Sequence, residues 1–482
     1  MFAQTNSFLN YMEVRDDMKR SLKRGMIDVL IANIINLVFS LLTNFILPGF
    51  LSVSSYADIK TYQLYVTYAG FMHLGFIDGM YLEYGGKEFQ DIDSSELRTT
   101  TSTLRFFQLL MTGLALATGF IIHDRVVLAF GLTLLPLNMG TCYKSLYQAT
   151  GDFKKYGLIL NISSIVKFIF NMGLIFFIRV DDSMYYIMTY AMVDFLVWGI
   201  LEYYFRDKIY IDSKNNNTLF SFSVLMRNIT KGFFLMLGNF SSIILTSMDR
   251  WFVKLLLTTV DFARYSFAVS IDSFLNVAIT PVTVTLYNYF CIHKEKDEII
   301  NIRKLIVVFS TVLIVLAFPA KFIVAVFISQ YEDANNLIFL LFGAQLFNVV
   351  IKGVYINLYK ARCQQNQYFL RLIAVIVIGF ISNGAFYMLN QSNSAFAAAT
   401  LFSSIIWFVV TVMDFKDVMI SKNEIIYMFL ALLIFLVTGI MFNAVIGMIL
   451  YIIALFILIL IFMRETLIET VHWIYGIVSS RK

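Results

Sequence analysis

Long apolar runs separated by short polar links fill the chain from about residue 27 to about residue 463. Each run approaches the roughly 20 apolar residues that a helix needs to cross a bilayer, whereas a tilted barrel strand needs about 10. The pattern therefore predicts an all-α polytopic membrane protein with about 14 transmembrane helices. The predicted helices cover residues 27–47, 62–82, 104–122, 126–148, 158–178, 185–204, 232–256, 263–290, 305–327, 337–359, 370–389, 395–413, 426–443 and 445–463.

These helices group into two lobes of six, followed by two more helices. The polar segment before the first helix is too long for the start of a cleavable signal peptide, so we expect the first helix to be retained. The predicted divisions are a cytoplasmic amphipathic segment (1–26), an N-terminal six-helix lobe (27–205), a cytoplasmic linker (206–231), a C-terminal six-helix lobe (232–413), two additional transmembrane helices (414–463) and a cytoplasmic tail (464–482).

Composition supports a membrane protein with almost no soluble part. Hydrophobic residues make up 59% of the 482 positions, charged residues make up 14%, and the mean hydropathy is +0.75. A soluble domain carries about 45–50% apolar and about 25% charged residues. The apolar surplus exceeds what a water-soluble core can bury, so most of the surface is expected to face lipid.

Basic residues predict the orientation. Of the 37 Lys and Arg residues, 27 fall on the side of the N-terminus, five lie in links on the other side, and five lie within spans. Short cytoplasmic loops carry an excess of Lys and Arg, so both termini are predicted to be cytoplasmic. Cys142, Cys291 and Cys363 fall at or near the same side, where thiols stay reduced, and no structural disulfide is expected.

Polar residues recur on one face of the first and seventh predicted helices. Steps of three and four residues place them on a single face of a helix. The two sets are offset by 206 residues and comprise Asn33, Asn36, Ser40, Thr43 and Asn44 in the first helix, and Asn239, Ser242, Thr246, Asp249 and Arg250 in the seventh. Both helices run from inside to outside, so the halves are predicted to be parallel repeats.

Two interpretations of these sets remain open. Small polar residues hold membrane helices together through hydrogen bonds of about 0.6 kcal/mol each. Alternatively, both sets line a water-filled substrate cavity. The shared register and the charged ends at Asp249 and Arg250 favour the cavity.

Charges inside the predicted spans also favour a cavity. Lys167 and Asp194 lie near the middle of the fifth and sixth helices, and Asp272 lies within the eighth. A charge at the bilayer centre costs about 2.5–3.5 kcal/mol even on a mild scale, so it must face protein or water. A structural ion pair between Lys167 and Asp194 is an equally good interpretation.

Three further charges are weaker candidates for the site. Asp78 lies toward the inner interface, where solvation lowers the cost of a charge. Arg250 lies near the outer interface, where an anchoring role is as plausible as a ligand role. Lys352 lies in the inner half of the tenth helix with no evident partner.

The sequence argues against an enzyme. The four histidines are scattered without metal-ligand spacing, no Ser-His-Asp arrangement stands out, and no P-loop is present. The links are too short for a catalytic or nucleotide-binding domain. We therefore expect a transporter without a metal or other cofactor.

Three local sequences carry a resemblance to a known family. They are LGFIDGMY at 74–81, SMDRWFV at 247–253, and VDFARYSF at 260–267 leading to a Thr-Pro pair at 280–281. With the arrangement of helices over the whole chain, they resemble the multidrug, oligosaccharidyl-lipid and polysaccharide exporter superfamily. The chain is most similar to its polysaccharide branch, the Wzx-type O-antigen flippases.

The resemblance implies a flippase of the bacterial inner membrane. The implied substrate is an undecaprenyl-diphosphate-linked oligosaccharide of O-antigen or capsule type, moved from the cytoplasmic to the outer leaflet by alternating access. The implied partners are this glycan, a polymerase and other glycan-assembly membrane proteins, with no role for nucleic acid. Coupling to an H⁺ or Na⁺ gradient and consumption of the product outside the cell both remain open as sources of energy.

Two alternatives stand beside the flippase. A cation-coupled multidrug antiporter of the same superfamily would use carboxylates such as Asp78, Asp194 and Asp272, but the Lys and Arg residues in the spans argue against it. A membrane-embedded glycan polymerase or transferase would need a catalytic site at one membrane face, for which the short links leave little room.

Overall fold

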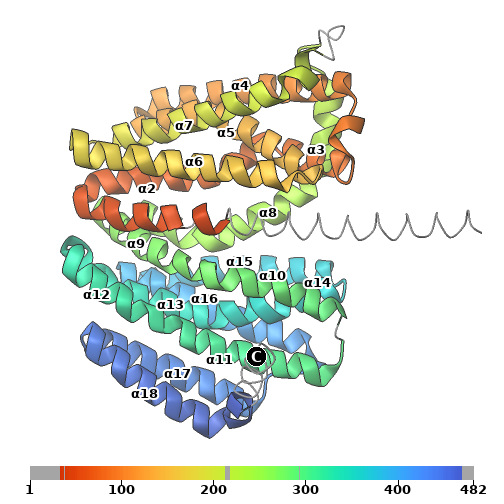
Figure 1. Cartoon of the computed structure of the whole chain (residues 1–482). Coiled ribbons are helices and arrows are strands. Elements are labelled where there is room, and N and C mark those ends of the chain that lie inside the picture. Colours follow the sequence, from red (N-terminus) through yellow and green to blue (C-terminus); the bar gives the residue numbers. More distant parts are fainter. Residues whose placement is uncertain (1–32, 37, 212–217, 293, 469–482) are drawn as a thin grey trace, which may run out of the picture. The chain divides into compact units, whose positions relative to one another are not determined.

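The computed structural model describes residues 33–36, 38–211, 218–292 and 294–468 of the chain (Figure 1). The predicted amphipathic segment 1–26 and most of the predicted tail lie outside these residues. Over the described ranges the secondary structure consists of α-helices and short 3-10 and π turns, without strands. The all-α fold class is confirmed.

Within the described residues, twelve helices are long and apolar enough to cross a membrane, or thirteen if a bent pair counts as one span. The chain divides into two compact units, Met1–Ile243 and Ile244–Lys482. The described helices of the first unit are Asn33–Phe50, α2 (Val53–Thr67), α3 (Phe76–Tyr84), α4 (Ser94–Ile122), α5 (Arg125–Ala149), α6 (Phe153–Gly173), α7 (Ser183–Arg206) and the first part of α8 (Phe222–Leu256).

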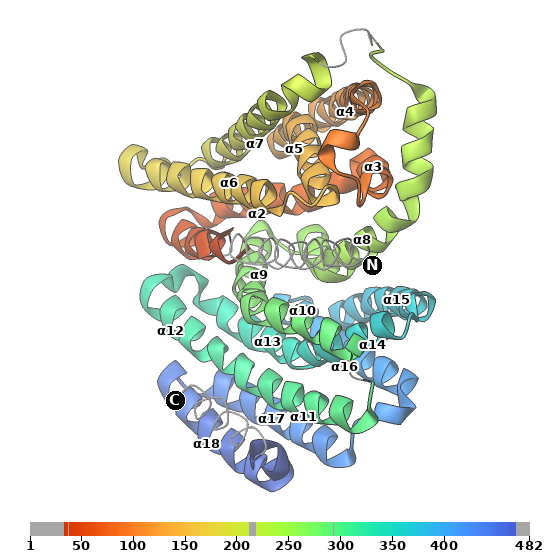
Figure 2. The same ribbon diagram turned by 45° about the vertical axis from the view of Figure 1, so that its right-hand side comes forward.

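The second unit contains the remaining helices. They are the rest of α8, α9 (Thr259–Asp272), α10 (Asn276–Ile292), α11 (Lys296–Leu313), α12 (Ala317–Phe327), α13 (Asn335–Val350), α14 (Ile356–Ala361), α15 (Gln365–Leu389), α16 (Asn393–Asp414), α17 (Lys422–Met441) and α18 (Ala444–Phe462). Within this unit α17 and α18 lie side by side, as both views show (Figure 1 and Figure 2). Asn443 caps α18 through its side chain, which allows this helix to begin directly after the short connection from α17.

Short polar caps explain how the helices can follow one another so closely. His123 ends α4 in a left-handed conformation and Asp124 then accepts hydrogen bonds from two backbone N–H groups at the start of α5. Asp93, Asp152 and Asp182 cap α4, α6 and α7 in the same way. A capping side chain satisfies backbone donors that a helix start leaves unpaired, which stabilises the helix by about 1 kcal/mol.

Several predicted helix boundaries are wrong. The predicted second helix, 62–82, is broken: α2 begins at Val53, and a 3-10 turn at Ala69–His73 separates it from α3. Leu74 and Gly75, with φ values of 50° and 84°, redirect the chain there. The eighth predicted helix is the bent pair α9 and α10, with an angle of 41°.

The predicted linker is also shorter than expected. After α7 a π turn continues to Ile211, and α8 begins at Phe222 rather than at residue 232. Much of the segment 206–231 is therefore helical. The predicted first helix, 27–47, is described from Asn33 and extends to Phe50.

Candidate functional site

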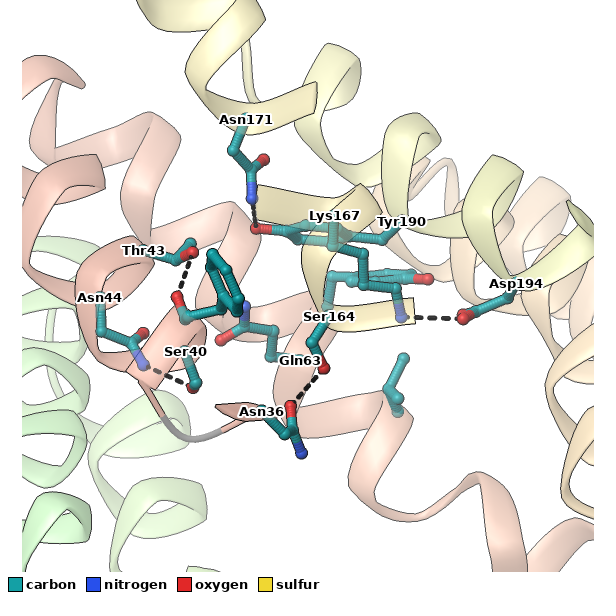
Figure 3. A pocket seen from close by; sticks show the side chains of 13 residues that line it. Asn36, Ser40, Thr43, Asn44, Gln63, Ser164, Lys167, Asn171, Tyr190 and Asp194 are labelled. Carbon is teal, nitrogen blue, oxygen red and sulfur yellow. Dashed lines mark hydrogen bonds and ion pairs between the residues drawn. The ribbon is translucent and has the colours of Figure 1, made fainter. Parts of the chain in front are cut away.

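A polar cavity of about 270 Å³ lies inside the first unit, between helix Asn33–Phe50, α2, α6 and α7 (Figure 3). Its volume is close to the lower end of the range for small-molecule sites. Its lining is Asn36, Phe39, Ser40, Thr43, Asn44, Tyr62, Gln63, Val66, Ser164, Lys167, Asn171, Tyr190 and Asp194.

The predicted polar face of the first helix lines this cavity. Asn36, Ser40, Thr43 and Asn44 belong to the lining, whereas the exposed Asn33 does not. The Ser164 hydroxyl donates to the Asn36 amide oxygen, and the Asn44 amide donates to the Ser40 hydroxyl at 3.3 Å (Figure 3). The polar face that helical spacing predicts for the first helix therefore lines the cavity and also forms a hydrogen bond to another helix.

Lys167 and Asp194 form an ion pair on another wall of the cavity. The Lys167 ammonium donates to Asp194 Oδ1 at 2.8 Å (Figure 3). The Lys167 side chain is 30% exposed and that of Asp194 is 9% exposed. Both residues also line the cavity. The ion pair and the position at a cavity were predicted as alternatives, and the structure contains both.

Aromatic rings complete the cavity. Tyr62 and Tyr190 stack with ring centroids 6.2 Å apart, and the Lys167 ammonium lies 6.0 Å from the Tyr190 ring centroid. The Tyr190 hydroxyl accepts from Asn171 at 3.2 Å, and Tyr62 shares a 2.8 Å hydrogen bond with Thr133. The site thus combines hydroxyl groups, amides, an ion pair and ring faces.

Lys60 lies beside the cavity, and the sequence prediction placed it wrongly. It was expected in a link outside the membrane, but it lies within α2 and is buried, with 7% exposure. Its ammonium donates to Asn44 Oδ1 at 2.6 Å and to Gln63 Oε1 at 3.1 Å. The error follows from starting the second helix at residue 62, because a start at Val53 puts Lys60 and Gln63 three residues apart on one helix face.

A second polar cluster that sequence reasoning missed surrounds Glu202 of α7. Its carboxylate accepts from Arg105, from the hydroxyls of Tyr143 (2.7 Å) and Tyr210, and from the Trp198 indole at 3.0 Å. Arg105 and Tyr143 come from α4 and α5. These two partners are 97 and 59 residues from Glu202, so no local pattern could have identified them.

Asn239 and Ser242, the first residues of the polar face predicted for the seventh helix, do not line this cavity. In the first unit, the Asn239 amide of α8 donates to Asp78 Oδ1 of α3 at 3.2 Å. The Asp78 carboxylate also lies 4.0 Å from the His73 imidazole. Ser242 is exposed on α8.

The other residues of this predicted polar face are Thr246, Asp249 and Arg250, and they belong to the second unit. Asp249 is buried and accepts from the hydroxyls of Tyr265 at 2.7 Å and Thr400 at 3.4 Å. Thr246 is exposed, and its carbonyl accepts from the Arg250 guanidinium at 3.4 Å. Asp249 is therefore held by two hydroxyl groups and by the backbone N–H of Arg250, which donates to Asp249 Oδ1 at 2.8 Å.

Asp272 and Lys352 lie in one region of the second unit. Asp272 Oδ2 accepts from the Gln345 amide of α13 at 2.7 Å, while Asp272 Oδ1 and Gln345 Oε1 have no hydrogen-bond partner in the structure. Lys352 lies two helical turns beyond Gln345, within a π turn at Ile351–Tyr355. π turns inside α-helices occur frequently at functional sites.

No metal site is evident in the described part of the chain. Groups of three or more His, Cys, Asp or Glu residues with metal-binding geometry are absent from the described ranges.

The sequence matches the family described as "Polysaccharide biosynthesis protein" over residues 99–291. Among solved structures, the fold is similar to that of lipid II flippase MurJ in an inward closed conformation. The TM-score is 0.59 with 13% sequence identity, and the match covers 91% of this chain and 99% of MurJ. The chain shares the fold of this flippase.

A second solved structure supports the same assignment. It is the inward-facing conformation of a multidrug resistance MATE family transporter of the MOP superfamily, with a TM-score of 0.54 and 11% identity. The match covers 79% of this chain and 95% of the transporter. No match to a curated protein sequence was found. The similarity predicted from the sequence is therefore supported at the level of the fold, and the chain is a multi-pass membrane protein.

Proposed function

We propose that the protein is a flippase for an undecaprenyl-diphosphate-linked oligosaccharide of O-antigen or capsule type. The observation that carries this proposal is the polar cavity inside a unit built mainly of long apolar helices. The match to polysaccharide biosynthesis proteins over residues 99–291 supports a glycan as the cargo. The similarity to the fold of the lipid II flippase supports a lipid-linked one.

The cavity chemistry suits a glycan headgroup. A lipid tail can remain in the bilayer while the sugar crosses, but each buried hydroxyl needs a hydrogen-bond partner. Asn36, Ser40 and Asn44 supply donors and acceptors on one helix face. Lys167 of α6 also lines the cavity and provides a positive charge for an anionic group such as a diphosphate.

Arg250 and Lys352 are proposed as further cationic contacts of the diphosphate during transport by alternating access. Asp78, Asp194, Asp249 and Asp272 are proposed as the carboxylates through which an H⁺ or Na⁺ gradient couples to this movement. We place the protein in the bacterial inner membrane with both termini in the cytoplasm, because most basic residues lie on that side of the predicted spans. A polymerase that consumes the exported glycan is the proposed partner.

The ion pair in the cavity disfavours a drug antiporter. An organic cation would need a carboxylate that is free to bind it, but Asp194 already holds the Lys167 ammonium at 2.8 Å. An organic cation that enters the cavity would have to displace the Lys167 ammonium from Asp194. Lys167 belongs to the same cavity lining, so it would remain a competitor. A neutral, hydroxyl-rich headgroup has no such competitor.

Deletion of the gene, followed by leaflet-resolved detection of the glycan-lipid, tests the proposal. Intact cells and lysed cells would be treated with a membrane-impermeant glycan probe. The proposal predicts that the deletion strain accumulates glycan-lipid that becomes reactive only after lysis, and that a plasmid copy restores its display. Normal display in the deletion strain would contradict the proposal, and dye efflux would then test the antiporter.

A further inference from the structure

A second cavity of the first unit lies at the opposite end of the helices from the caps at Asp124 and Asp182. It has a volume of about 320 Å³ and is formed by three connections: between α3 and α4, between α5 and α6, and at the end of α7. The basic-residue bias predicts all three to be cytoplasmic. Its lining is Glu88, Phe89, Gln90, Tyr147, Thr150, Asp152, Lys155, Tyr204 and Phe205.

The cavity has a rigid aromatic base. Phe205 is almost fully buried, and its ring lies 5.4 Å from the Phe89 ring and 4.8 Å from the Tyr147 ring. The Tyr143 ring also stacks on Phe205, with ring centroids 4.8 Å apart. Rings packed in this way keep their positions, so a ligand would meet a preformed apolar surface.

Polar groups with unused hydrogen-bonding capacity surround this base. Within the described residues, no hydrogen bond or ion pair engages the Glu88 carboxylate, the Gln90 amide or the Tyr204 hydroxyl. Tyr204 is 62% exposed, which leaves one face of its ring open. The cavity therefore offers acceptors, donors and a free aromatic face together.

The charges of the cavity exclude two classes of ligand. Lys155 of the lining is paired with Asp152 at 2.8 Å, and the adjacent Lys208 donates to the Gln90 carbonyl oxygen at 2.9 Å. Both ammonium groups are engaged, and Glu88 repels a phosphate. The Lys155 ammonium also lies 5.5 Å from the Tyr147 ring centroid, and it therefore already occupies the place where an organic cation would bind. A neutral molecule with many hydroxyl groups and apolar ring faces fits the remaining chemistry.

We propose that this cavity is a saccharide-binding site that receives the neutral glycan headgroup before it crosses the membrane. The proposal rests on the proposed function for the source of the sugar, although the site itself is defined by the residues above. Tyr204 contacts the face of a sugar ring, and the Phe89 and Tyr147 rings form the apolar base beside it. Glu88 and Gln90 bind sugar hydroxyls.

The adjacent Tyr203 provides a matched control. It is 61% exposed, nearly the same as Tyr204, and it belongs to the same turn of α7, but it does not line the cavity. Loss of either ring removes a similar amount of exposed aromatic surface. Only Tyr204→Ala removes a wall of the proposed site.

Binding to the purified full-length protein in lipid nanodiscs tests the site. The probe is the neutral repeat-unit oligosaccharide released from its lipid carrier, measured by saturation-transfer NMR and calorimetric titration. We expect saturable binding to the unmodified protein, a loss of about tenfold in affinity for Tyr204→Ala, and no change for Tyr203→Ala. A polyprenyl diphosphate without a glycan should not displace the oligosaccharide.

Three results would overturn the saccharide site: no binding to the unmodified protein, equal weakening by Tyr203→Ala and Tyr204→Ala, or displacement by the glycan-free carrier. The leaflet assay of the deletion strain is a separate readout. If the oligosaccharide binds at this cavity but the deletion strain displays its glycan normally, the flippase proposal fails while the site stands. If the deletion strain hides its glycan and Tyr204→Ala binds normally, the site fails while the flippase proposal stands.

Discussion

Lys167 and Asp194 illustrate how a single pair of residues can satisfy both the membrane and the cavity. Either charge alone near the centre of a bilayer costs about 2.5–3.5 kcal/mol, and the 2.8 Å pair offsets much of this cost. The lysine side chain remains 30% exposed, so the pair is partly open to the cavity. The same lysine can therefore meet a substrate anion without becoming an isolated buried charge.

Single and double substitutions separate these two roles. Lys167→Met or Asp194→Asn alone should destabilise the protein by between about 1 kcal/mol, as for exposed pairs, and about 3–5 kcal/mol, as for buried ones. The double variant should recover thermal stability in detergent because no unpaired charge remains. Glycan display should stay low in the double variant if Lys167 contacts the substrate.

Recovery of display together with stability would show that the pair is structural only. Lys60 offers a comparison within the same region, since it contacts Asn44 but does not line the cavity.

Arg303 and Glu424 form the most deeply buried ion pair of the described second unit, with both side chains 2% exposed. The guanidinium makes two hydrogen bonds to the carboxylate, at 3.0 and 2.8 Å, and also donates to the carbonyl oxygens of Val418 and Met419. Glu424→Gln should lower the free energy of unfolding by about 3–5 kcal/mol, measured by thermal or denaturant unfolding in detergent.

The exposed pair Arg362–Asp417 is the control for this prediction. Its side chains are 32% and 49% exposed, so Asp417→Asn should change stability by less than about 1 kcal/mol. If Glu424→Gln and Asp417→Asn lower the free energy of unfolding equally, the buried pair does not stabilise the protein more than an exposed pair does.

The Arg362–Asp417 pair also predicts a pH dependence. The hydrogen bonds from Arg362 lower the pKa of the Asp417 carboxyl below its ordinary value. A lowered folded-state pKa means that the pair contributes its full stability above the ordinary pKa of about 4, and that this contribution is lost as the pH falls through the folded-state pKa. Unfolding temperatures of the unmodified protein and of Asp417→Asn should converge in strong acid, and a constant difference at all pH values would argue against it.

At the scale of helices, the contact between α3 and α8 depends on missing side chains. A Cβ atom on Gly79 would lie 1.9 Å from the Asn228 carbonyl oxygen, and one on Gly232 would lie 2.0 Å from the Gly75 carbonyl oxygen. The two backbones therefore touch directly, as glycines allow in membrane helices. Lys231 and Glu83 pair beside this contact.

Gly79→Ala should force α3 and α8 apart. Overpacking of this kind typically costs about 1–3 kcal/mol, which thermal unfolding in detergent would measure. Gly113→Ala in α4 is the matched control, since no atom lies within 4 Å of its added Cβ. The control should be neutral or stabilising by up to about 1 kcal/mol. A stable Gly79→Ala variant would contradict the close contact.

The sequence predicted most helices but not this contact. Apolar length and helical spacing are local properties, and they identified the long spans and the polar face of Asn36, Ser40 and Asn44. The break between α2 and α3 was missed because the residues around it are largely apolar and contain no proline. The turn at Leu74 and Gly75 depends on the approach of α8, which only the folded chain shows.

The candidate site was predictable to the same degree. The bilayer core makes exposure of a charged or polar side chain to lipid costly in free energy. Lys167, Asp194 and the polar face of the first helix could therefore be expected to face protein or water. Their common cavity depends on how four helices meet, and no residue spacing encodes that arrangement. The Glu202 cluster was missed for the same reason, since its partners come from α4, α5 and α7.

At the scale of the whole molecule, the chain consists of apolar helices with short connections, and its described residues contain no separate catalytic domain. The polar cavity proposed for the substrate lies among the helices of the first unit. This arrangement fits a carrier that moves a headgroup past the bilayer core while leaving a lipid tail outside. It also places every proposed substrate contact on a helix or in a short connection between two helices.

Transport by the purified protein in sealed lipid vesicles tests the central claim most directly. The vesicles would contain lipid-linked oligosaccharide in both leaflets, and a membrane-impermeant glycosidase would be added outside. We predict that vesicles with the protein lose nearly all of the glycan over time, whereas protein-free vesicles lose only the outer-leaflet fraction. If both kinds of vesicle retain the same protected fraction, the protein does not flip this lipid and the account is wrong.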